Sequence, residues 1–206
     1  LRREGPLTRS DLTSALGLSP AKIGQTVRGL IDSSLVTDNE LGPSEGGRRP
    51  ALLRLASGIE FALGIDWGSE NMRAVVLDAE GSVLIQERRS LDVPQASVDS
   101  LVSVLYETAQ SALNSAKASG IHVSGIGLGI TGFVDTVRGE CISIPAIAGP
   151  IQLPIEQMVR STLAVDRVII NDSGRCMALA EKRMGLGKGI QNLVFINMGG
   201  CISGGI

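Results

Sequence analysis

The stretch LGIDWGSENMRAVVLD, residues 63–78, decides the fold of most of this chain. Apolar residues gather on both sides of Gly68 and Ser69, which predicts two strands joined by a tight turn. A third strand is expected after the next turn, at Glu80 and Gly81. The three strands expected here span 61–67, 72–78 and 82–87.

Downstream of this stretch, helices and strands alternate. Helical spacing is clearest over 98–116, where eight apolar residues recur every three or four positions. Further helices are expected at 154–163 and 173–184, and further strands at 123–130, 168–170 and 193–197. Three strands, a helix and then this alternation predict an α/β fold with a mixed sheet flanked by helices.

Several of these strands end in residues suited to a small polar ligand. Glycine-rich turns follow three of the strands, and such turns expose backbone N–H groups to phosphate or sugar. Asp66 and Asp172 each stand at a strand end, which favours a ligand cleft at that edge of the sheet. The chain has no P-loop motif. The candidate ligand-binding residues are Gly68, Ser69, Gly132, Asn171 and Asp172.

Three roles are open to Asp172. Its carboxylate can bond a hydroxyl of a bound sugar. It can instead cap the helix that starts at Ser173, a position for which Asp is well suited. In a kinase it would be the general base that takes the proton from an attacking sugar hydroxyl.

The first 57 residues have a different pattern. A helix is expected within 7–18, capped by Thr8 or Ser10, with an apolar side that includes Leu12 and Leu16. Ser19 then caps a second helix, whose apolar stripe recurs at helical spacing over 23–31. Two short helices joined by a glycine-containing turn form a helix-turn-helix pattern.

The opposite face of the second helix is polar, and its side chains can bond base edges or phosphates in a major groove. A β-hairpin is expected next, around the sequence GGRRP at 46–50, whose arginines suit phosphate or minor-groove contact. A solvated helix face and a solubilising turn are the alternatives. The candidate DNA-binding residues are Ser19, Lys22, Gln25, Thr26, Arg28, Arg48 and Arg49.

Charge also divides the chain. Residues 1–57 hold eight basic and six acidic residues, whereas 58–206 hold eleven and fifteen. This small asymmetry, together with the helix-turn-helix pattern and the basic hairpin, leads us to expect a DNA-binding domain at 1–57 and an α/β domain at 58–206. Aromatic residues make up 2% of the chain, which argues against a base-stacking surface for single-stranded nucleic acid.

The cysteines and the histidine do not form a metal-binding pattern. Cys141, Cys176 and Cys201 lie far apart, and His122 has no partner at ligand spacing, so no metal or cofactor is expected within this chain. The chain has neither a signal peptide nor a run of about 18 apolar residues. These features predict a soluble, cytoplasmic protein with reduced thiols and no membrane contact.

Together these motifs resemble the ROK family of bacterial sugar kinases and sugar-responsive transcriptional repressors. GRRP (47–50) is typical of its repressor branch. The stretches 63–78 and 197–206 are similar to its two phosphate motifs, 125–135 to its P-G-P-V-D loop, and 170–185 to the segment with the catalytic aspartate. The resemblance implies a winged helix-turn-helix followed by an actin-like, ribonuclease-H-like α/β domain. It also implies a domain incomplete at the C-terminus, ending before the region where the family carries zinc.

Some positions depart from the kinase pattern. Where kinases have D-x-G-G-T, this chain has Trp67 and Glu70, and we expect the bulky indole and the acid to obstruct ATP. Ala146 stands where a sugar-contacting asparagine is expected, and Gly174 and Arg175 are also unusual.

We therefore expect a transcriptional regulator without enzymatic activity. It would bind double-stranded operator DNA as a homodimer, because paired half-sites usually demand a dimer, and would sense a sugar or sugar phosphate. One alternative is an ATP-dependent sugar kinase of the same family, with Asp172 as its catalytic residue. Another is a non-functional remnant whose core is incomplete.

Overall fold

The computed structural model describes residues 1, 5–43, 49–56, 60–92, 96–199 and 201–206. They form two compact units. The smaller unit comprises 1–60 with 78–82, and the larger unit comprises 61–77 with 83–206. Each unit has its own cluster of buried apolar side chains.

Polar side chains fix where the two helices of the smaller unit begin. α1 (Arg9–Leu16) is capped by Thr8, whose hydroxyl accepts the Asp11 N–H while the Asp11 carboxylate accepts the Thr8 N–H. Gly17 ends α1 in the left-handed region, at φ 64°. α2 (Pro20–Asp32) is capped by Ser19. The predicted cap at Ser19 is confirmed, and of the two candidates for α1 the structure uses Thr8.

The apolar side predicted for α1 is largely wrong. α1 has no buried residue, and Leu16 is 60% exposed. Only Leu12 packs, in part, against the small core. α2 supplies that core instead, with Ile23 and Val27 buried, because its longer apolar stripe faces the hairpin.

An antiparallel hairpin completes the smaller unit. β1 (Val36–Leu41) pairs with β2 (Ala51–Leu55), and Leu53 of β2 is fully buried against Ile23, Val27 and Val36. β1 continues through the polar residues Asp38, Asn39 and Glu40. The hairpin tolerates them because its other side faces solvent, where Glu40 accepts a hydrogen bond from Arg54 at 2.9 Å.

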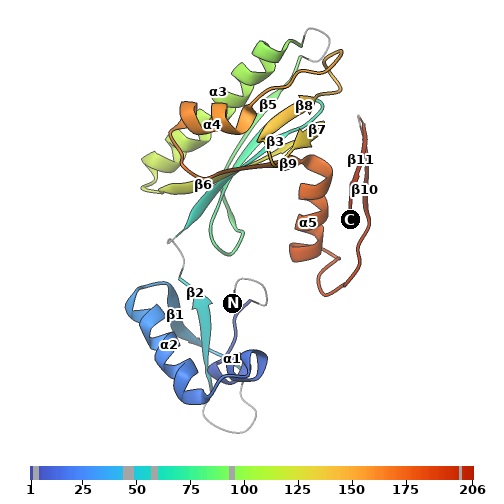
Figure 1. Cartoon of the computed structure of the whole chain (residues 1–206). Coiled ribbons are helices and arrows are strands. Elements are labelled where there is room, and N and C mark those ends of the chain that lie inside the picture. The colour runs from blue at the N-terminus through green and yellow to red at the C-terminus, as the bar shows by residue number, and fades with distance from the viewer. Residues whose placement is uncertain (2–4, 44–48, 57–59, 93–95, 200) are drawn as a thin grey trace. The chain divides into compact units, whose positions relative to one another are not determined.

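A five-stranded mixed sheet frames the larger unit, in the order β5-β4-β3-β6-β9 (Figure 1). β3 (Phe61–Trp67), β4 (Asn71–Leu77) and β5 (Val83–Ser90) are antiparallel neighbours. β6 (Val123–Ile130) and β9 (Val168–Asp172) extend the sheet parallel to β3. The predicted mixed α/β architecture is confirmed.

Helices lie on both faces of this sheet (Figure 1). α3 (Val98–Ala118) and α4 (Ile155–Leu163) pack on one face, where alternate residues of β3 and β4 are buried. α5 (Ser173–Met184) lies at the other face, where a Cβ added at Gly129 would be 3.4 Å from Cys176 Sγ. In the described part of the chain, no helix is both long and apolar enough to cross a bilayer.

Two short hairpins complete the unit. β7 (Phe133–Asp135) pairs with β8 (Glu140–Ser143), and β10 (Phe195–Met198) pairs with β11 (Ile202–Gly205). The sequence pattern predicted only a strand near β10. Glycines allow β11 to cross α5 at backbone distance, because a Cβ at Gly174 would lie 2.4 Å from the Gly204 carbonyl oxygen.

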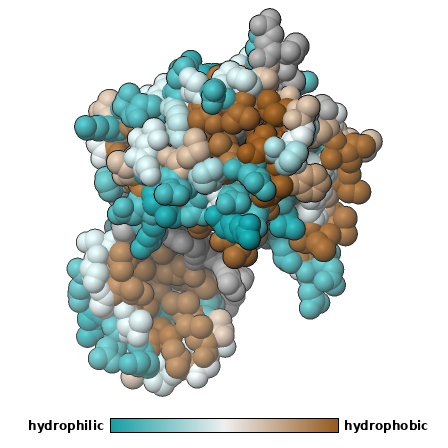
Figure 2. Space-filling model, turned by 45° about the horizontal axis from the view of Figure 1, so that its top comes forward, coloured by the Kyte–Doolittle hydropathy of each residue, from teal (hydrophilic) through white to brown (hydrophobic). Residues whose placement is uncertain are grey.

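The outer side of the β10–β11 hairpin is apolar. Ile196, Met198 and Ile202 are 65%, 78% and 76% exposed, and Met198 pairs with Ile202 across the hairpin. Figure 2 shows hydrophobic residues at the right-hand edge of the larger unit, where β10 and β11 lie in Figure 1.

Candidate functional site

The three parallel strands bring several predicted ligand residues to one edge of the sheet. β3, β6 and β9 all end at that edge, and their last residues stand in two rows. The first row is Asp66, Gly129 and Asn171, and the second is Trp67, Ile130 and Asp172. Because successive strand residues point to opposite faces, the two rows supply different sides of the sheet.

Asp66 is the centre of a polar cluster on the α5 side. Its carboxylate accepts hydrogen bonds from Arg73 at 3.3 Å and from Ser173 Oγ at 3.4 Å. The Thr131 hydroxyl in turn donates to Ser173 Oγ at 3.4 Å. Both hydroxyl bonds are long compared with the usual 2.7–2.8 Å or so. The two hydroxyls are therefore weakly held by these bonds.

Asp172 caps α5. One carboxylate oxygen accepts the Arg175 N–H at 2.8 Å, and the other lies 3.2 Å from Arg175 Nε. The capping role is therefore present in the structure, and Arg175 engages both oxygens. A ligand hydroxyl that bonded this carboxylate would have to share it with Arg175 or displace it.

The cysteines lie in apolar or acidic surroundings. Burial raises the pKa of the Cys176 thiol, and the negative charges of Asp172 and Asp66 raise it further. Burial also raises the pKa of Cys141, to about 11. Both thiols are therefore protonated at neutral pH. Among the described residues, no group of three or more His, Cys, Asp and Glu side chains is placed to hold a metal ion.

A cavity of about 300 Å³ opens beside the β3–β4 turn. Gly68, Ser69 and Ala146, three positions singled out in the sequence, line it, whereas Gly132, Asn171 and Asp172 do not. Trp67 and Glu70, the two departures from the kinase pattern, line it as well, and so do Thr131 and Cys201 from two of the quoted motifs. The remaining walls come from positions that no motif marked, which are Leu91, Leu101, Ile144 and Pro145.

Trp67 lies deeper than expected. Its side chain is fully buried on the α3 side of β3, so it is part of the core and does not lie exposed over the turn to obstruct ATP. The ring nevertheless borders the cavity. Its Nε1–H is buried and has no hydrogen-bond partner among the described residues.

Two of the predicted ligand glycines have a packing explanation. A Cβ at Gly68 would lie 2.9 Å from the Asn71 carbonyl oxygen, across the β3–β4 turn. A Cβ at Gly132 would lie 2.1 Å from the Ser143 carbonyl oxygen. Close backbone approach therefore requires glycine at both positions, whether or not a ligand binds there.

The candidate DNA-binding residues of the smaller unit gather on one side of α2. Ser19, Lys22, Gln25, Thr26 and Arg28 are all exposed, and Ile23 and Val27 are buried on the opposite side. Arg49, which precedes β2, is exposed as well. Arg48 lies outside the described residues.

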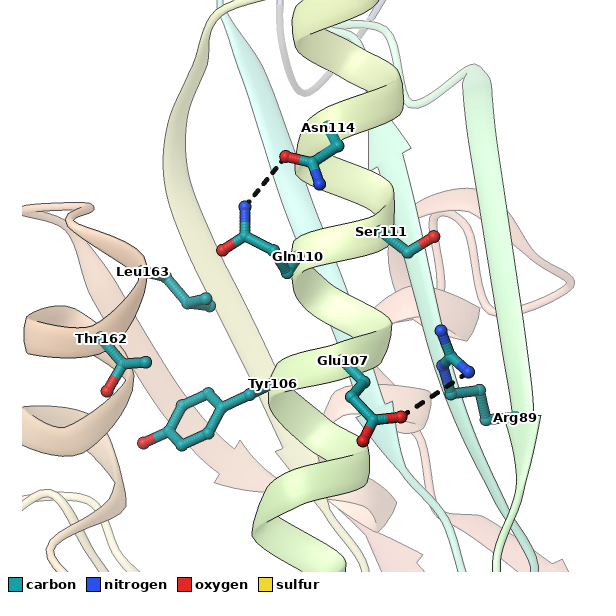
Figure 3. Close-up of a pocket in the computed structure, with 8 residues that line it drawn as sticks. All are labelled: Arg89, Tyr106, Glu107, Gln110, Ser111, Asn114, Thr162 and Leu163. Atoms are coloured by element: carbon teal, nitrogen blue, oxygen red, sulfur yellow. Dashed lines mark hydrogen bonds and ion pairs between the residues drawn. The ribbon is translucent and has the colours of Figure 1, made fainter.

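A second hollow, of about 490 Å³, lies between α3, α4 and the end of β5 (Figure 3). Its polar side chains are largely paired with one another. Gln110 donates to Asn114 at 3.1 Å, and Arg89 lies 3.7 Å from Glu107. None of the predicted site residues lines this hollow.

Comparison with known proteins identifies relatives of two kinds. Residues 62–206 match the model of the ROK family. The chain is 24% identical to a putative xylose repressor of Caldicellulosiruptor sp. (strain Rt8B.4), over 97% of this chain and 49% of that protein. It is 23% identical to the xylose repressor of Bacillus subtilis (strain 168), over 99% of this chain and 52% of that protein. A glucokinase of Streptomyces coelicolor is 29% identical, over 71% of this chain and 43% of that protein.

Solved structures share the fold. A ROK family transcriptional regulator, a homolog of the Escherichia coli MLC protein, aligns with a TM-score of 0.73 at 22% identity, over 98% of this chain and 50% of that one. A ROK family glucokinase from Streptomyces griseus, in complex with glucose and AMPPNP, aligns with a TM-score of 0.61 at 23% identity, over 70% of this chain and 43% of that one. The chain spans about half the length of the curated relatives it matches.

Proposed function

This chain belongs to the ROK family, and from that premise we propose that it is a transcriptional regulator that binds double-stranded DNA and senses a sugar or sugar phosphate. The relatives that align with nearly its whole length carry repressor names, whereas the glucokinase aligns with 71% of it. The family model begins at residue 62, so it does not account for the preceding segment.

The polar face of α2 carries this proposal. The helix buries Ile23 and Val27 and leaves Lys22, Gln25 and Arg28 in solvent, next in sequence to an antiparallel hairpin. We propose that residues 1–57 form a winged helix-turn-helix in which α2 reads the major groove and the β1–β2 hairpin is the wing. Residues 58–206 are then the sensing domain, with an actin-like, ribonuclease-H-like fold.

The wing is tested with Arg48→Ala/Arg49→Ala. Removal of two phosphate-binding charges weakens binding to every DNA sequence and lowers the slope of log K against log salt by about 1 per lost contact. A titration over salt concentration measures both quantities. Arg183→Ala removes an exposed charge from α5 and serves as the control. An affinity and a slope unchanged by the double substitution would contradict the wing assignment.

The recognition helix is tested with Gln25→Ala and Thr26→Ala. Side chains that contact base edges set sequence preference, at about 1–3 kcal/mol for each good contact. Footprinting on the DNA around the protein's own coding region, with and without D-xylose, glucose or N-acetylglucosamine, locates the operator. Each variant is expected to bind operator DNA less tightly, so that its preference for the operator over random DNA falls. Its affinity for random DNA should stay unchanged.

Sensing requires two states. A ligand shifts an equilibrium only through different affinities for the two states, so the sugar must favour one arrangement of paired DNA-binding domains. We propose a homodimer for this reason, because two half-sites are held by two recognition helices. The sugar site includes Gly68, Ser69, Gly132, Asn171 and Asp172.

A sugar kinase is the second candidate, favoured by the glucokinase similarity and by Asp172 at the end of β9. Against it, Arg73 and Arg175 already pair with Asp66 and Asp172. A coupled assay of ADP release over a panel of hexoses decides between the two. Turnover that Asp172→Asn abolishes would replace the regulator proposal with a kinase.

A further inference from the structure

In the described part of the chain, the β10–β11 hairpin is packed against α5 on one side and open on the other. On the packed side, a Cβ at Gly205 would lie 2.7 Å from the Ala178 side chain. On the open side, alternate residues of both strands are exposed. The large apolar side chains exposed there are Val194, Ile196, Met198, Ile202 and Ile206. A contiguous apolar patch of this kind marks a contact surface (Figure 2).

The segment that forms this patch carries no charge. Residues 189–206 contain no Asp, Glu, Lys, Arg or His. A nucleic acid would find no cation there for its phosphates. A charged protein surface would lose hydration on contact without gaining an ion pair. A second copy of the same surface meets neither obstacle, because a neutral apolar face is not repelled by itself.

The open side also has a shape that suits a second copy. Ile196 of β10 is paired with Gly204 of β11, and both are exposed, so a side chain stands next to a position that has none. With a twofold axis beside these two positions, each Ile196 fills the gap over Gly204 of the other copy. Twofold interfaces have this property, because residue i contacts residue j of the other copy and j contacts i.

We propose that the open side of the β10–β11 hairpin is an interface between two copies of this chain, packed face to face about a twofold axis beside Ile196 and Gly204. The largest apolar patch of an ordinary monomer covers about 300–600 Å², so two such patches bury about 600–1,200 Å² in total. Interfaces of that size are weak or transient. The dimer is therefore reversible and dissociates on dilution.

This interface deepens the proposed function. The inference rests on that function for its regulatory meaning, because paired DNA-binding domains require a contact between two copies of the chain. The contact itself is measurable without DNA and without a sugar.

Sedimentation velocity of the intact chain measures its association. Between about 1 µM and about 100 µM, where weak interfaces associate, we expect the monomer to give way to a dimer. Ile196→Asp and Ile196→Lys each place like charges beside the axis and should weaken association at least about tenfold. Val83→Asp is the matched control, because Val83 is an exposed apolar residue of β5 in the same unit, and it should leave association unchanged.

A mixture of the two charged variants tests the twofold axis. Equal amounts of the Ile196→Asp and Ile196→Lys chains should form heterodimers, because opposite charges then lie near each other across the axis. Ile196→Thr keeps the branched shape that strands favour and should weaken association without adding a charge. This variant separates a loss of contact from a folding defect, and its circular dichroism should match that of the unsubstituted chain.

Several results would overturn this inference. They are a chain that stays monomeric throughout, assemblies that grow beyond the dimer, a dimer that the Ile196 variants leave intact, equal weakening by Val83→Asp, and a mixture of charged variants that stays monomeric. A monomeric chain would assign the open side of the hairpin to a different polypeptide.

The failure of this inference is distinguishable from that of the proposed function. A chain that dimerises through the hairpin and protects no operator keeps this inference and loses the regulator role. A chain that protects an operator, and whose Ile196→Asp variant still dimerises, does the opposite.

Discussion

Gly174, in the first turn of α5, faces the backbone of β11 with no room for a side chain. A Cβ there would lie 2.4 Å from the Gly204 carbonyl oxygen and 2.8 Å from its nitrogen. Gly174→Ala should therefore overpack the contact and lower the free energy of unfolding by about 1–3 kcal/mol. Urea denaturation of the whole chain measures this change. Gly127→Ala is the control, because nothing lies within 4 Å of a Cβ at that position, and an equal loss in both variants would contradict the packing argument.

Cys141 should be the least reactive of the three thiols. It is fully buried, and burial raises its pKa to about 11 from an ordinary value of 9.0. Labelling with a thiol reagent at pH 8 should modify the partly buried Cys176 and Cys201 before Cys141, which should react only after unfolding. Because the folded pKa is raised, the protonated thiol favours the folded state at low pH. The contribution of the protonated Cys141 thiol to the free energy of unfolding should decline as the pH rises from about 9 to about 11. Rapid labelling of Cys141 in the folded chain would refute this.

The caps of α1, α2 and α5 could be predicted from sequence because an N-cap depends on a few neighbouring residues. Thr8, Ser19 and Asp172 each accept an N–H three residues ahead. The β7–β8 and β10–β11 hairpins could not be predicted, because they are short, and β11 is held against α5 by tertiary contact. The same limit applies to the cavity. The local sequence predicted a turn at Gly68 and Ser69. Leu91, Leu101 and Cys201 are far from that turn in the sequence, and only the folded structure brings them to the cavity.

Helix α2 contains two glycines that the fold does not require. A Cβ at Gly24 or Gly29 would meet nothing within 4 Å. Since glycine within a helix costs roughly 1 kcal/mol relative to alanine, Gly24→Ala and Gly29→Ala should each stabilise the smaller unit by about that amount. Thermal denaturation followed by circular dichroism measures this gain. A loss of operator affinity in the stabilised variants would show that the DNA backbone approaches these positions, and a loss of stability would contradict the open space around them.

At the scale of the whole molecule, the two units have separate cores. A substitution that destabilises the core of one unit should therefore leave the other unit folded. Leu53 is fully buried in a cluster that has four buried residues within the described part of the smaller unit. Leu53→Ala should cost about 2–5 kcal/mol and unfold the smaller unit. Operator binding should be lost, while Trp67 emission from the larger unit stays unchanged.

Leu41→Ala is the matched control for this experiment. Leu41 lies in the same hairpin and is 61% exposed, so its truncation should leave operator binding intact. A red shift of Trp67 emission in Leu53→Ala would mean that the two cores depend on each other.

The contact of Gly174 with Gly204 also has a mechanical consequence. α5 is capped by the Asp172 carboxylate and, two residues later at Gly174, touches the β10–β11 hairpin with no side chain in between. Because backbone packs directly on backbone here, a shift of α5 should carry the hairpin with it. A sugar that displaced Arg175 from the Asp172 carboxylate and moved α5 would therefore also move the apolar outer surface of the hairpin.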